Sequence, residues 1–495
     1  MSLLGIDIGT THIKAGLFRE NGSLIKLSIQ KNIVHRDQSG HSYYNPEEMW
    51  EITTRAIQEA TSAYDETIAA IGVTSMAESG VLLDRSTGKA NSHIIPWFDR
   101  RTEAISARIG ETIDPLAQFQ KTGLHNSYKH GLAKLLWLKE NGTGITENMV
   151  WVSTSDYIAY KLTGEIATDY TLAARTFAFQ IDKKTWNTPL IEQFNLPDGV
   201  FPDALPSGNP VGNTSAGNVV EQGIPVAVSG HDHVCTMLAA GVADPGVTLN
   251  SIGTAEALVG SISERELGEA EYQSGFNFGC HVIPGKYFWM GGIQSSGGSV
   301  EWLRDQFSNQ EMISYEAMEQ LIDQGDQTPT GILYYPYLAG SGSPAPDPDA
   351  KGAFIGLRAS HGKGDLYKAL LEGTAYELNY MKKAAMEMDL GEVSRLISVG
   401  GGTNNKTWMQ IKADVTNCKL TIPEISEVTL LGAALVAGRG CGLYENTEEV
   451  LDIVRETRRK QVTPDEDNHR RYSRIFEEGY LPLQQPLRNF YRTTR

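Results

Sequence analysis

Apolar and polar residues alternate in three short segments at the beginning of the chain. The segments are residues 3–8, 13–18 and 23–30, and Asn21-Gly22 separates the last two. Both residues of an Asn-Gly pair tolerate positive φ, which makes the pair a strong hairpin signal. The pattern therefore predicts three strands that follow one another as a meander.

A helix and a fourth strand are expected after this meander. Residues 46–64 open with proline and two glutamates, and Asn45 before them predicts an N-cap. Residues 68–74 form an apolar run typical of a buried strand. Three strands, a helix and another strand open an α/β domain with a mixed sheet.

A similar plan returns in the second half of the chain. Strands are expected at 247–252, 255–262, 287–290 and 397–399, with helices over 299–307 and around 408–411. Sequence identity between the halves is too low to establish a repeat on its own. Because 495 residues exceed what one core usually holds, we expect two domains, 1–245 and 246–495. A polar helix expected over 464–480 could pack back on the first domain.

Composition and charge exclude several classes of protein. With 40% hydrophobic and 21% charged residues the chain is an ordinary globular protein. A net charge of −17 argues against binding to nucleic acid or to an anionic membrane, which need clustered positive charge. The four cysteines form no C-x-x-C pair, and the N-terminus lacks the pattern of a signal peptide. No apolar stretch is long enough to span a membrane, so a cytoplasmic location is expected.

Two glycine-threonine turns predict a phosphate site. In the first turn, Gly9-Thr10-Thr11, backbone N–H groups and hydroxyls can bind phosphate oxygens, while Asp7 before it can hold Mg²⁺ and Lys14 follows in the same motif. The second turn, Gly253-Thr254, offers the same chemistry in the other half. One turn alone could be a tight hairpin with a capping aspartate. Two turns, one in each domain, would clamp a triphosphate from both sides.

Two common nucleotide motifs are absent from the sequence. It contains no G-x-x-x-x-G-K-[ST] segment and no G-x-G-x-x-G segment that opens a helix after a strand. Neither a Walker-type site nor a dinucleotide-binding fold is therefore supported.

Five motifs follow one another over nearly the whole chain, from about residue 3 to residue 445. They are Asp7-Ile8-Gly9-Thr10-Thr11, Pro96-Trp97-Phe98-Asp99-Arg100-Arg101-Thr102, Gly230-His231-Asp232-His233, Gly352-Ala353-Phe354-Ile355-Gly356-Leu357 and Gly400-Gly401-Gly402. In order and spacing they resemble the FGGY carbohydrate kinases, a family that includes glycerol, xylulose, ribulose, fuculose, rhamnulose and gluconate kinases. The resemblance implies the α/β actin-like ATPase fold, in which two ribonuclease-H-like domains close over MgATP. One departure is Gly131, where the family usually shows Pro, Ser or Thr.

The resemblance implies that Asp232 is the catalytic base. It also implies that Asp232, together with Asp7, lies near the Mg²⁺ ion. A sugar hydroxyl is a weak nucleophile, and a nearby carboxylate can accept its proton as the phosphoryl group arrives. Asp232 could instead be the N-cap of a helix over 234–240. The alternation of His231 and His233 around Asp232 could also indicate a metal site, although no third ligand at a recognisable spacing supports zinc.

The resemblance also implies which residues contact the sugar. They are Met76, Ala77, Glu78, Trp97, Asp99 and His233. Trp97 could offer an apolar face to sugar C–H groups or belong to the core, and Asp99 could instead cap a helix over 100–109. Glycerol kinases have Arg-Glu where this chain has Ala77-Glu78, so the missing arginine counts against glycerol. Xylulose kinases have Met-His-Gly at the same place, so neither substrate can be carried over.

The adenosine end of the nucleotide would lie at a glycine-rich turn between a strand and a helix. The implied contacts are Gly401, Gly402, Thr403 and Asn405, together with Gly297 and Glu301. Glycine allows the nucleotide to lie against the backbone. The same turn could serve only to pack the helix on the strand.

The sequence therefore predicts a phosphotransferase with an alcohol group as acceptor, which moves the γ-phosphoryl group of MgATP to a small sugar. A five- or six-carbon ketose such as xylulose is the expected acceptor, with gluconate or a polyol as alternatives. An actin-like ATPase switch without sugar kinase activity and a metal-dependent hydrolase are the competing classes. Whether the chain acts as a homodimer stays open.

Overall fold

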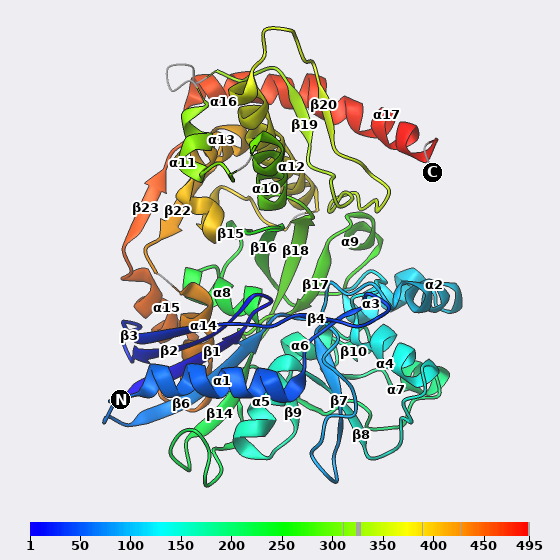
Figure 1. Cartoon of the computed structure of the whole chain (residues 1–495), viewed down its shortest axis with the longest axis vertical. Coiled ribbons are helices and arrows are strands. Elements are labelled where there is room, and N and C mark those ends of the chain that lie inside the picture. Colours follow the sequence, from blue (N-terminus) through cyan, green and yellow to red (C-terminus); the bar gives the residue numbers. More distant parts are fainter. Residues whose placement is uncertain (310, 323–327, 389, 426, 494–495) are drawn as a thin grey trace.

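A computed structural model describes residues 1–309, 311–322, 328–388, 390–425 and 427–493. The chain forms two α/β lobes, one above the other in Figure 1, and each is built around a mixed sheet. None of the helices in these ranges is long and apolar enough to cross a bilayer.

The first lobe contains a six-stranded sheet. Across the sheet the strands are β13 (Pro210–Asn213), β14 (Pro225–His231), β6 (Ile68–Ser75), β1 (Ser2–Ile8), β2 (His12–Arg19) and β3 (Leu24–Lys31). β1, β2 and β3 pair antiparallel, so the predicted meander is confirmed. β6 pairs parallel with both β1 and β14, which confirms the mixed sheet.

The second lobe contains a seven-stranded sheet. Across it the strands are β17 (Asn277–Cys280), β18 (Lys286–Ile293), β16 (Glu256–Ser263), β15 (Val247–Ile252), β21 (Arg395–Val399), β22 (Lys419–Pro423) and β23 (Arg459–Val462). The strands expected in this half are all present, with ends that differ by a few residues.

The two sheets share one plan of pairing. β15, β16 and β18 repeat the antiparallel meander of β1, β2 and β3. On the other side of β15, β21 pairs parallel with β15 and β22 pairs parallel with β21. In the first lobe β6 and β14 continue from β1 in the same way. The edge strands β13 and β23 both pair antiparallel with their neighbours. The similarity of the halves that sequence identity could not establish is therefore a shared topology.

Helices cover both sheets, and short strand pairs form separate two-stranded sheets. The first-lobe helices are α1 (Pro46–Thr61), α2 (Glu103–Thr112), α3 (Pro115–Thr122), α4 (Gly131–Glu140), α5 (Thr154–Thr163), α6 (Tyr170–Ala174), α7 (Thr188–Gln193) and α8 (Asp232–Ala240). Those after residue 246 are α9 (Glu269–Gln273), α10 (Gly297–Phe307), α11 (Tyr315–Gln320), α12 (Lys363–Glu387), η1 (Gly401–Asn404), α13 (Lys406–Thr416), α14 (Val428–Gly440), α15 (Thr447–Arg455), α16 (Glu466–Ile475), η2 (Phe476–Tyr480) and α17 (Leu481–Arg492). The short pairs are β4 (His35–Arg36) with β5 (Ser42–Tyr43), β7 (Gly80–Asp84) with β8 (Met149–Ser153), β9 (Ala167–Asp169) with β12 (Asp203–Leu205), β10 (Phe179–Gln180) with β11 (Thr185–Trp186), and β19 (Leu333–Tyr335) with β20 (Ala353–Ile355).

Helix α14 belongs to the second half of the chain but packs on the sheet of the first lobe. A side chain on Gly432 would lie 2.1 Å from the carbonyl oxygen of Cys235 on α8, so the two helices touch through backbone. Ser229 on β14 donates a hydrogen bond of 2.7 Å to the carbonyl of Ala433. Leu430 and Ala434 are fully buried in an apolar cluster that contains residues of both sheets. α8 and α14 therefore form the layer that joins the lobes.

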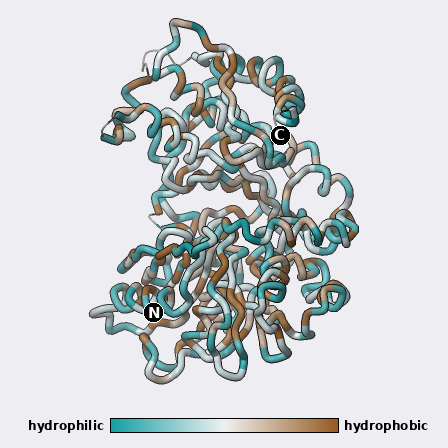
Figure 2. The backbone as a smooth tube through the Cα atoms, turned by 45° about the vertical axis from the view of Figure 1, so that its right-hand side comes forward, coloured by the Kyte–Doolittle hydropathy of each residue, from teal (hydrophilic) through white to brown (hydrophobic). Residues whose placement is uncertain are grey.

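Buried apolar residues form a large cluster in each lobe. Figure 2 colours the apolar residues brown along the whole backbone.

Three local expectations need correction. The first helix ends at Thr61 rather than near residue 64, because Ser62 is extended and Ala63 has a φ of 58°. The helix expected from residue 100 begins at Glu103.

The third correction concerns the C-terminal helices, which pack on the second lobe rather than on the first. Glu377 on α12 accepts hydrogen bonds from the Tyr480 hydroxyl at 2.7 Å and from Gln484 Nε2 at 3.0 Å. Tyr335 on β19 donates to the carbonyl of Tyr480 at 2.8 Å.

Candidate active site

A cavity of about 550 Å³ lies between the two lobes. The predicted residues that line it are Thr10, Met76, Ala77, Glu78, Trp97, Asp232, His233 and Gly253. They come from both halves of the chain, so the fold brings the first turn, the second turn and the sugar segments to one place.

The first turn connects β1 to β2. The Gly9 N–H donates to the carbonyl of His12 at 3.0 Å, which closes the hairpin, and the Thr11 hydroxyl meets His12 Nδ1 at 3.1 Å. The Thr10 hydroxyl accepts a hydrogen bond of 3.1 Å from Trp97 Nε1. This bond joins the predicted phosphate turn to the predicted sugar segment.

The second turn holds the corresponding position between β15 and β16 and is fixed by the beginning of α10. The N–H of Gly297 donates to the carbonyl of Gly253 at 3.1 Å, and the N–H of Gly298 donates to that of Thr254 at 2.9 Å. A Cβ on Gly297 would lie 2.4 Å from the Gly253 oxygen, so only glycine allows this approach.

The glycine-rich turn after β21 adjoins the second turn, but it does not line the 550 Å³ cavity. A Cβ on Gly402 would lie 2.3 Å from a methyl group of Ile252, whereas Gly401 has open space around it. The Thr403 hydroxyl donates to the carbonyl of Gly400 at 2.8 Å. Asn405 caps α13 by accepting from the N–H of Trp408 at 2.8 Å, so its side-chain oxygen has a structural role.

Glu301 also lies outside the walls of this cavity. Its carboxylate forms an ion pair of 2.7 Å with Arg304 and accepts a hydrogen bond from the Tyr315 hydroxyl. These two partners occupy both of its oxygens.

Asp232 is the first residue of α8, and its carboxylate is held at one oxygen. Oδ1 accepts from the N–H of His233 at 2.7 Å and lies 3.0 Å from Nδ1 of the same residue and 3.1 Å from Nε2 of His231. The expected N-cap role is wrong, because His231 occupies that position and makes no side-chain cap. Oδ2 has no hydrogen-bond partner in the described part of the chain and can accept one from a ligand.

The two histidines control the ionisation of this carboxylate. Burial alone would raise the pKa of Asp232, but His233 and His231 outweigh it and hold the pKa well below its usual range. For His233, burial alone would lower the pKa, but the charge of Asp232 outweighs burial and raises the pKa above its usual value. Asp232 is therefore ionised at every physiological pH.

Asp7 lies at the end of β1 and is buried, with its Oδ1 lacking a hydrogen-bond partner in the described residues. Burial and the nearby charge of Asp232 raise the pKa of Asp7 to about 7. An orphaned carboxylate oxygen beside a second carboxylate fits a Mg²⁺ site, because the cation would satisfy both. Lys14 does not balance this charge alone, since it forms an ion pair of 2.7 Å with Glu427.

Glu78 is held in an unusual backbone conformation by two cations. Its φ is 57°, in the left-handed region that non-glycine residues rarely adopt. The buried ammonium of Lys134 donates to the carbonyls of Glu78 and of Ile95, the latter at 3.2 Å, and so ties the two sugar segments together. Arg175 binds the Glu78 carboxylate through Nε at 2.8 Å and through a second, shorter bond from Nη2.

The pKa of Glu78 reflects this pairing. Burial would raise it, but the Arg175 guanidinium, with His231 and His130, lowers the pKa to about 2. Both contacts of Arg175 go to Oε1, so Oε2 stays available for a ligand in the cavity.

Asp99 does not line the cavity, and neither of its expected roles matches the structure. Its carboxylate accepts from Arg101 Nε at 2.6 Å and from the N–H of Ser42 at 2.6 Å. The cap position of α2 belongs to Thr102. Trp97 does line the cavity, and its N–H groups bind Thr10 and Ser79.

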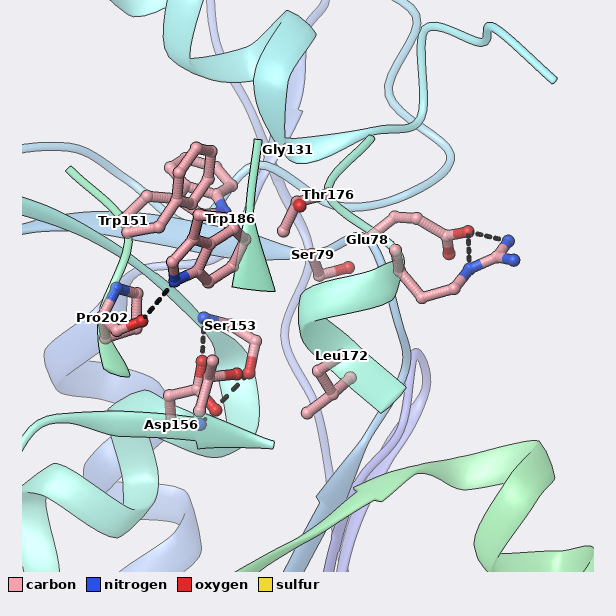
Figure 3. A pocket seen from close by; sticks show the side chains of 13 residues that line it. Glu78, Ser79, Gly131, Trp151, Ser153, Asp156, Leu172, Thr176, Trp186 and Pro202 are labelled. Atoms are coloured by element: carbon pink, nitrogen blue, oxygen red, sulfur yellow. Dashed lines mark hydrogen bonds and ion pairs between the residues drawn. The ribbon is translucent and has the colours of Figure 1, made fainter. Parts of the chain in front are cut away.

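A second, small cavity of about 20 Å³ is lined in part by Glu78. Figure 3 shows Glu78 at its edge and Asp156 joined to Ser153 by dashed lines. Burial raises the pKa of Asp156 to about 7. The volume suits one water molecule and excludes a sugar.

His231, Asp232 and His233 could each offer a ligand atom within 4.8 Å of one another. His231 Nε2 and His233 Nδ1 both lie next to Asp232 Oδ1. This arrangement is compatible with two histidines that orient a carboxylate and equally with a metal site.

Several residues of the cavity carried no signal in the sequence. Arg175 lines the cavity and stands 97 positions after Glu78. Lys129 and His130 line the cavity beside Glu78 without belonging to a motif. The only sequence feature noted near them was Gly131, a departure from the family pattern.

Comparison with known proteins gives consistent results. Models of the N-terminal and C-terminal domains of the FGGY family of carbohydrate kinases match residues 2–239 and 249–441. The chain is 28% identical to the xylulose kinase of Bacillus subtilis (strain 168) over 485 residues, which cover 96% of this chain and 95% of the relative. It is 28% identical to the glycerol kinase of Saccharolobus islandicus (strain M.16.27) over 460 residues, 91% of this chain and 90% of the relative. The crystal structure of xylulose kinase from Rhodospirillum rubrum has a TM-score of 0.88 at 25% identity and covers 99% of this chain and 100% of its own.

Proposed function

The chain belongs to the FGGY family of carbohydrate kinases and is an ATP-dependent sugar kinase, and from this premise we propose that Asp232 activates the acceptor hydroxyl in the cavity between the lobes. The observation that carries the proposal is that Thr10, Asp232 and Gly253 all line one cavity. Two corresponding turns from lobes of the same topology thereby face one ionised carboxylate. The ribonuclease-H-like assignment of both sheets belongs to this proposal and is supported by their shared strand pairing.

The proposed reaction is a single displacement. Asp232 Oδ2 accepts the proton of a sugar hydroxyl while the hydroxyl oxygen forms a bond to the γ-phosphorus of ATP and the bond to the bridging oxygen of ADP breaks. The two histidines on Oδ1 keep the other oxygen turned toward the acceptor. The base is ionised throughout, so no protonation step limits it.

The phosphate groups would lie between the first and second turns. Backbone N–H groups of the two turns can bind and position the transferring phosphoryl group. Such positioning and charge stabilisation are the main source of catalysis in this class of reaction. Mg²⁺, when bound, would neutralise charge on the phosphates, and Asp7 and Asp232 are the residues that would hold it. The adenosine end would follow the turn at Gly401 and Gly402.

The acceptor would contact Glu78 Oε2 and Trp97 at the other end of the cavity. A five- or six-carbon ketose such as xylulose is the first acceptor to test, because relatives similar over almost the full length are named xylulose kinases. A cytoplasmic location is also part of the proposal, supported by four cysteines that form no disulfide.

A coupled ADP-release assay over ketoses, polyols and aldonic acids tests the proposal. We expect one sugar to give fast turnover with the wild type, and Asp232→Asn to lower kcat by about 10²-fold or more. Exposed Asp203→Asn serves as the matched control. ATP hydrolysis that needs no sugar and survives Asp232→Asn would refute the assigned base and favour an ATPase switch.

A further inference from the structure

The peptide group between Gly230 and His231 leads directly to Asp232 and lies where β14 reaches the end of its sheet. The pairing of β14 with β6 shifts register between Val228 and Gly230, which marks a β-bulge. Among the described residues, β13 pairs with β14 as far as Ala227, so the ladder on that side ends before this peptide group. A bulge beside an active site redirects the side chains that follow it.

Two buried threonine hydroxyls hold this peptide group, one at each end. The hydroxyl of Thr74 on β6 donates to the carbonyl of Gly230 at 2.6 Å. The N–H of His231 donates to the hydroxyl of Thr171 on α6 at 2.8 Å. Both threonines are fully buried, and a Cβ on Gly230 would lie 2.6 Å from the Thr171 hydroxyl oxygen. Because the two partners belong to different elements, they define one orientation of the peptide plane.

The hydroxyl of Thr171 is held in turn by Asp169, the N-cap of α6. It accepts from the N–H of His231, so its own hydrogen points to Asp169 Oδ1, which lies 3.1 Å away. The Asp169 carboxylate also accepts from the N–H groups of Thr171 and Leu172, each at 3.0 Å. The hydroxyl of Ser207 donates to it as well. Hydrogen bonds therefore run in one direction, from the peptide group through Thr171 to a carboxylate that is itself fixed.

The same short helix also holds the sugar side of the cavity. Arg175 directly follows the last residue of α6, and its guanidinium binds the carboxylate of Glu78. Thr171 and Arg175 are four positions apart, about one helical turn. α6 thereby sets the segment that leads to Asp232 relative to the carboxylate proposed to contact the acceptor.

We propose that Thr171 is a positioning residue for the phosphoryl transfer, because it fixes the peptide group that directs Asp232 toward the acceptor. Thr171 does not line the cavity, so it acts only through the residues that it holds. His231 Nε2 lies 3.1 Å from Asp232 Oδ1, and a turn of the peptide group would move both side chains. The inference rests on the proposed role of Asp232 as the base. A reacting group misplaced by about 1 Å can cost about 10²-fold in rate.

Thr171→Val tests the inference, because valine fills the same space and lacks the hydroxyl. The ADP-release assay uses xylulose, or the sugar of the ketose, polyol and aldonate panel that turns over fastest. We expect kcat to fall by about 10- to 100-fold, while KM for the sugar and for ATP changes by less than about threefold. Thr171→Ser should restore most of kcat, because it keeps the hydroxyl.

Two other threonines complete the set of variants. Thr74→Val should also lower kcat, because it frees the other end of the peptide group, and it tests the inference if Thr171→Val does not fold. Thr53→Val is the matched control and should keep the wild-type kcat. Thr53 is equally buried, but its hydroxyl donates to the carbonyl of Met49 within α1 at 2.7 Å.

Asp232→Asn provides the background that separates positioning from general damage to the fold. Without the base there is no proton acceptor to direct, so Thr171→Val should lower the residual kcat of Asp232→Asn by less than about threefold. Binding of ADP, measured by calorimetry, gives the folded fraction by which each kcat is corrected.

An equal loss in both backgrounds would overturn the inference, because the hydroxyl would then only support the fold. A kcat of Thr171→Val within about twofold of wild type would overturn it too, as would a Thr171→Ser variant as slow as Thr171→Val. In these cases a slow Asp232→Asn still supports the proposed function. An Asp232→Asn variant as fast as wild type would refute the assigned base, and the inference with it.

Discussion

Removal of the Arg175 guanidinium should destabilise the first lobe through Glu78. In Arg175→Met the Glu78 carboxylate stays buried, with 10% of its side chain exposed, and loses both hydrogen bonds. Methionine has a similar length and fills the space, so the change removes charge more than volume.

The magnitude follows from the pKa of Glu78. A pKa of about 2 in place of 4.5 corresponds to about 3 kcal/mol of stabilisation of the ionised form. This contribution is complete above pH 4.5 and is lost as the pH falls from 4.5 toward 2, because the native pKa lies below the unfolded one. For a lobe of this size, about 3 kcal/mol lowers the Tm by roughly 6–12 °C.

Differential scanning calorimetry at pH 7 and at pH 4 measures both effects. We expect Arg175→Met to lower the Tm of the first-lobe transition at pH 7 and a smaller difference to remain at pH 4, because Glu78 becomes protonated in the variant but stays ionised in the wild type until the pH approaches 2. The double variant Glu78→Gln, Arg175→Met should recover most of the loss, because no buried charge remains. Arg100→Met is the control, since its guanidinium is 66% exposed and its pair with Glu103 should contribute little.

A Tm at pH 7 within about 2 °C of wild type would refute this reasoning. So would a double variant that is as unstable as the single one. Either result would mean that the pair is solvated or that the guanidinium acts only through packing.

Three further results are expected. A protonated Asp7 carboxyl cannot ligate a cation, so the Mg²⁺ concentration for half-maximal activity in the ADP-release assay should rise about tenfold for each pH unit below about 7. Asp7→Asn should need more Mg²⁺ at every pH and should show no such dependence on pH. Lys412→Met should destabilise the second lobe by about 3–5 kcal/mol in calorimetry, because it strands the fully buried Glu256 partner at 2.6 Å, and a failure of Glu256→Gln to restore stability would contradict this. Gly297→Ala should raise KM for ATP by about tenfold and leave KM for the sugar unchanged, because the new Cβ would lie 2.4 Å from a carbonyl oxygen of the second turn. Gly144→Ala is the control, since Gly144 has open space around it. An unchanged KM for ATP in Gly297→Ala would contradict the geometry.

Local signals predicted what depends on neighbouring residues. The hairpin at Asn21-Gly22 and the cap at Asn45 follow from backbone preferences of single residues, and both are present. The order of strands could be predicted because an apolar period and turn chemistry identify each one. Helix ends were less certain, as Ala63 shows, because a left-handed residue leaves no mark in an alternating pattern.

The walls of the cavity depend on contacts between distant segments, and these could not be predicted. Arg175 meets Glu78 only because α6 ends where the segment after β6 passes. Asp99 was assigned to the sugar from its place in a motif, yet Arg101 and the backbone of Ser42 bind it. A motif fixes which residues are near in sequence, whereas the charge balance of a site depends on the whole fold.

The position of α14 has a consequence for the synthesis of the chain. When the ribosome has produced residues 1–245, the strands of the first sheet exist, but the helix that covers β1, β6 and β14 does not. At about 5–20 residues per second, roughly 10–40 s pass before residue 440 is made. During this interval the face that Leu430 and Ala434 will cover is exposed to water. A fragment that ends at residue 245 would keep that face open permanently, so the first lobe should be recovered in soluble form only when the 428–440 segment is supplied with it.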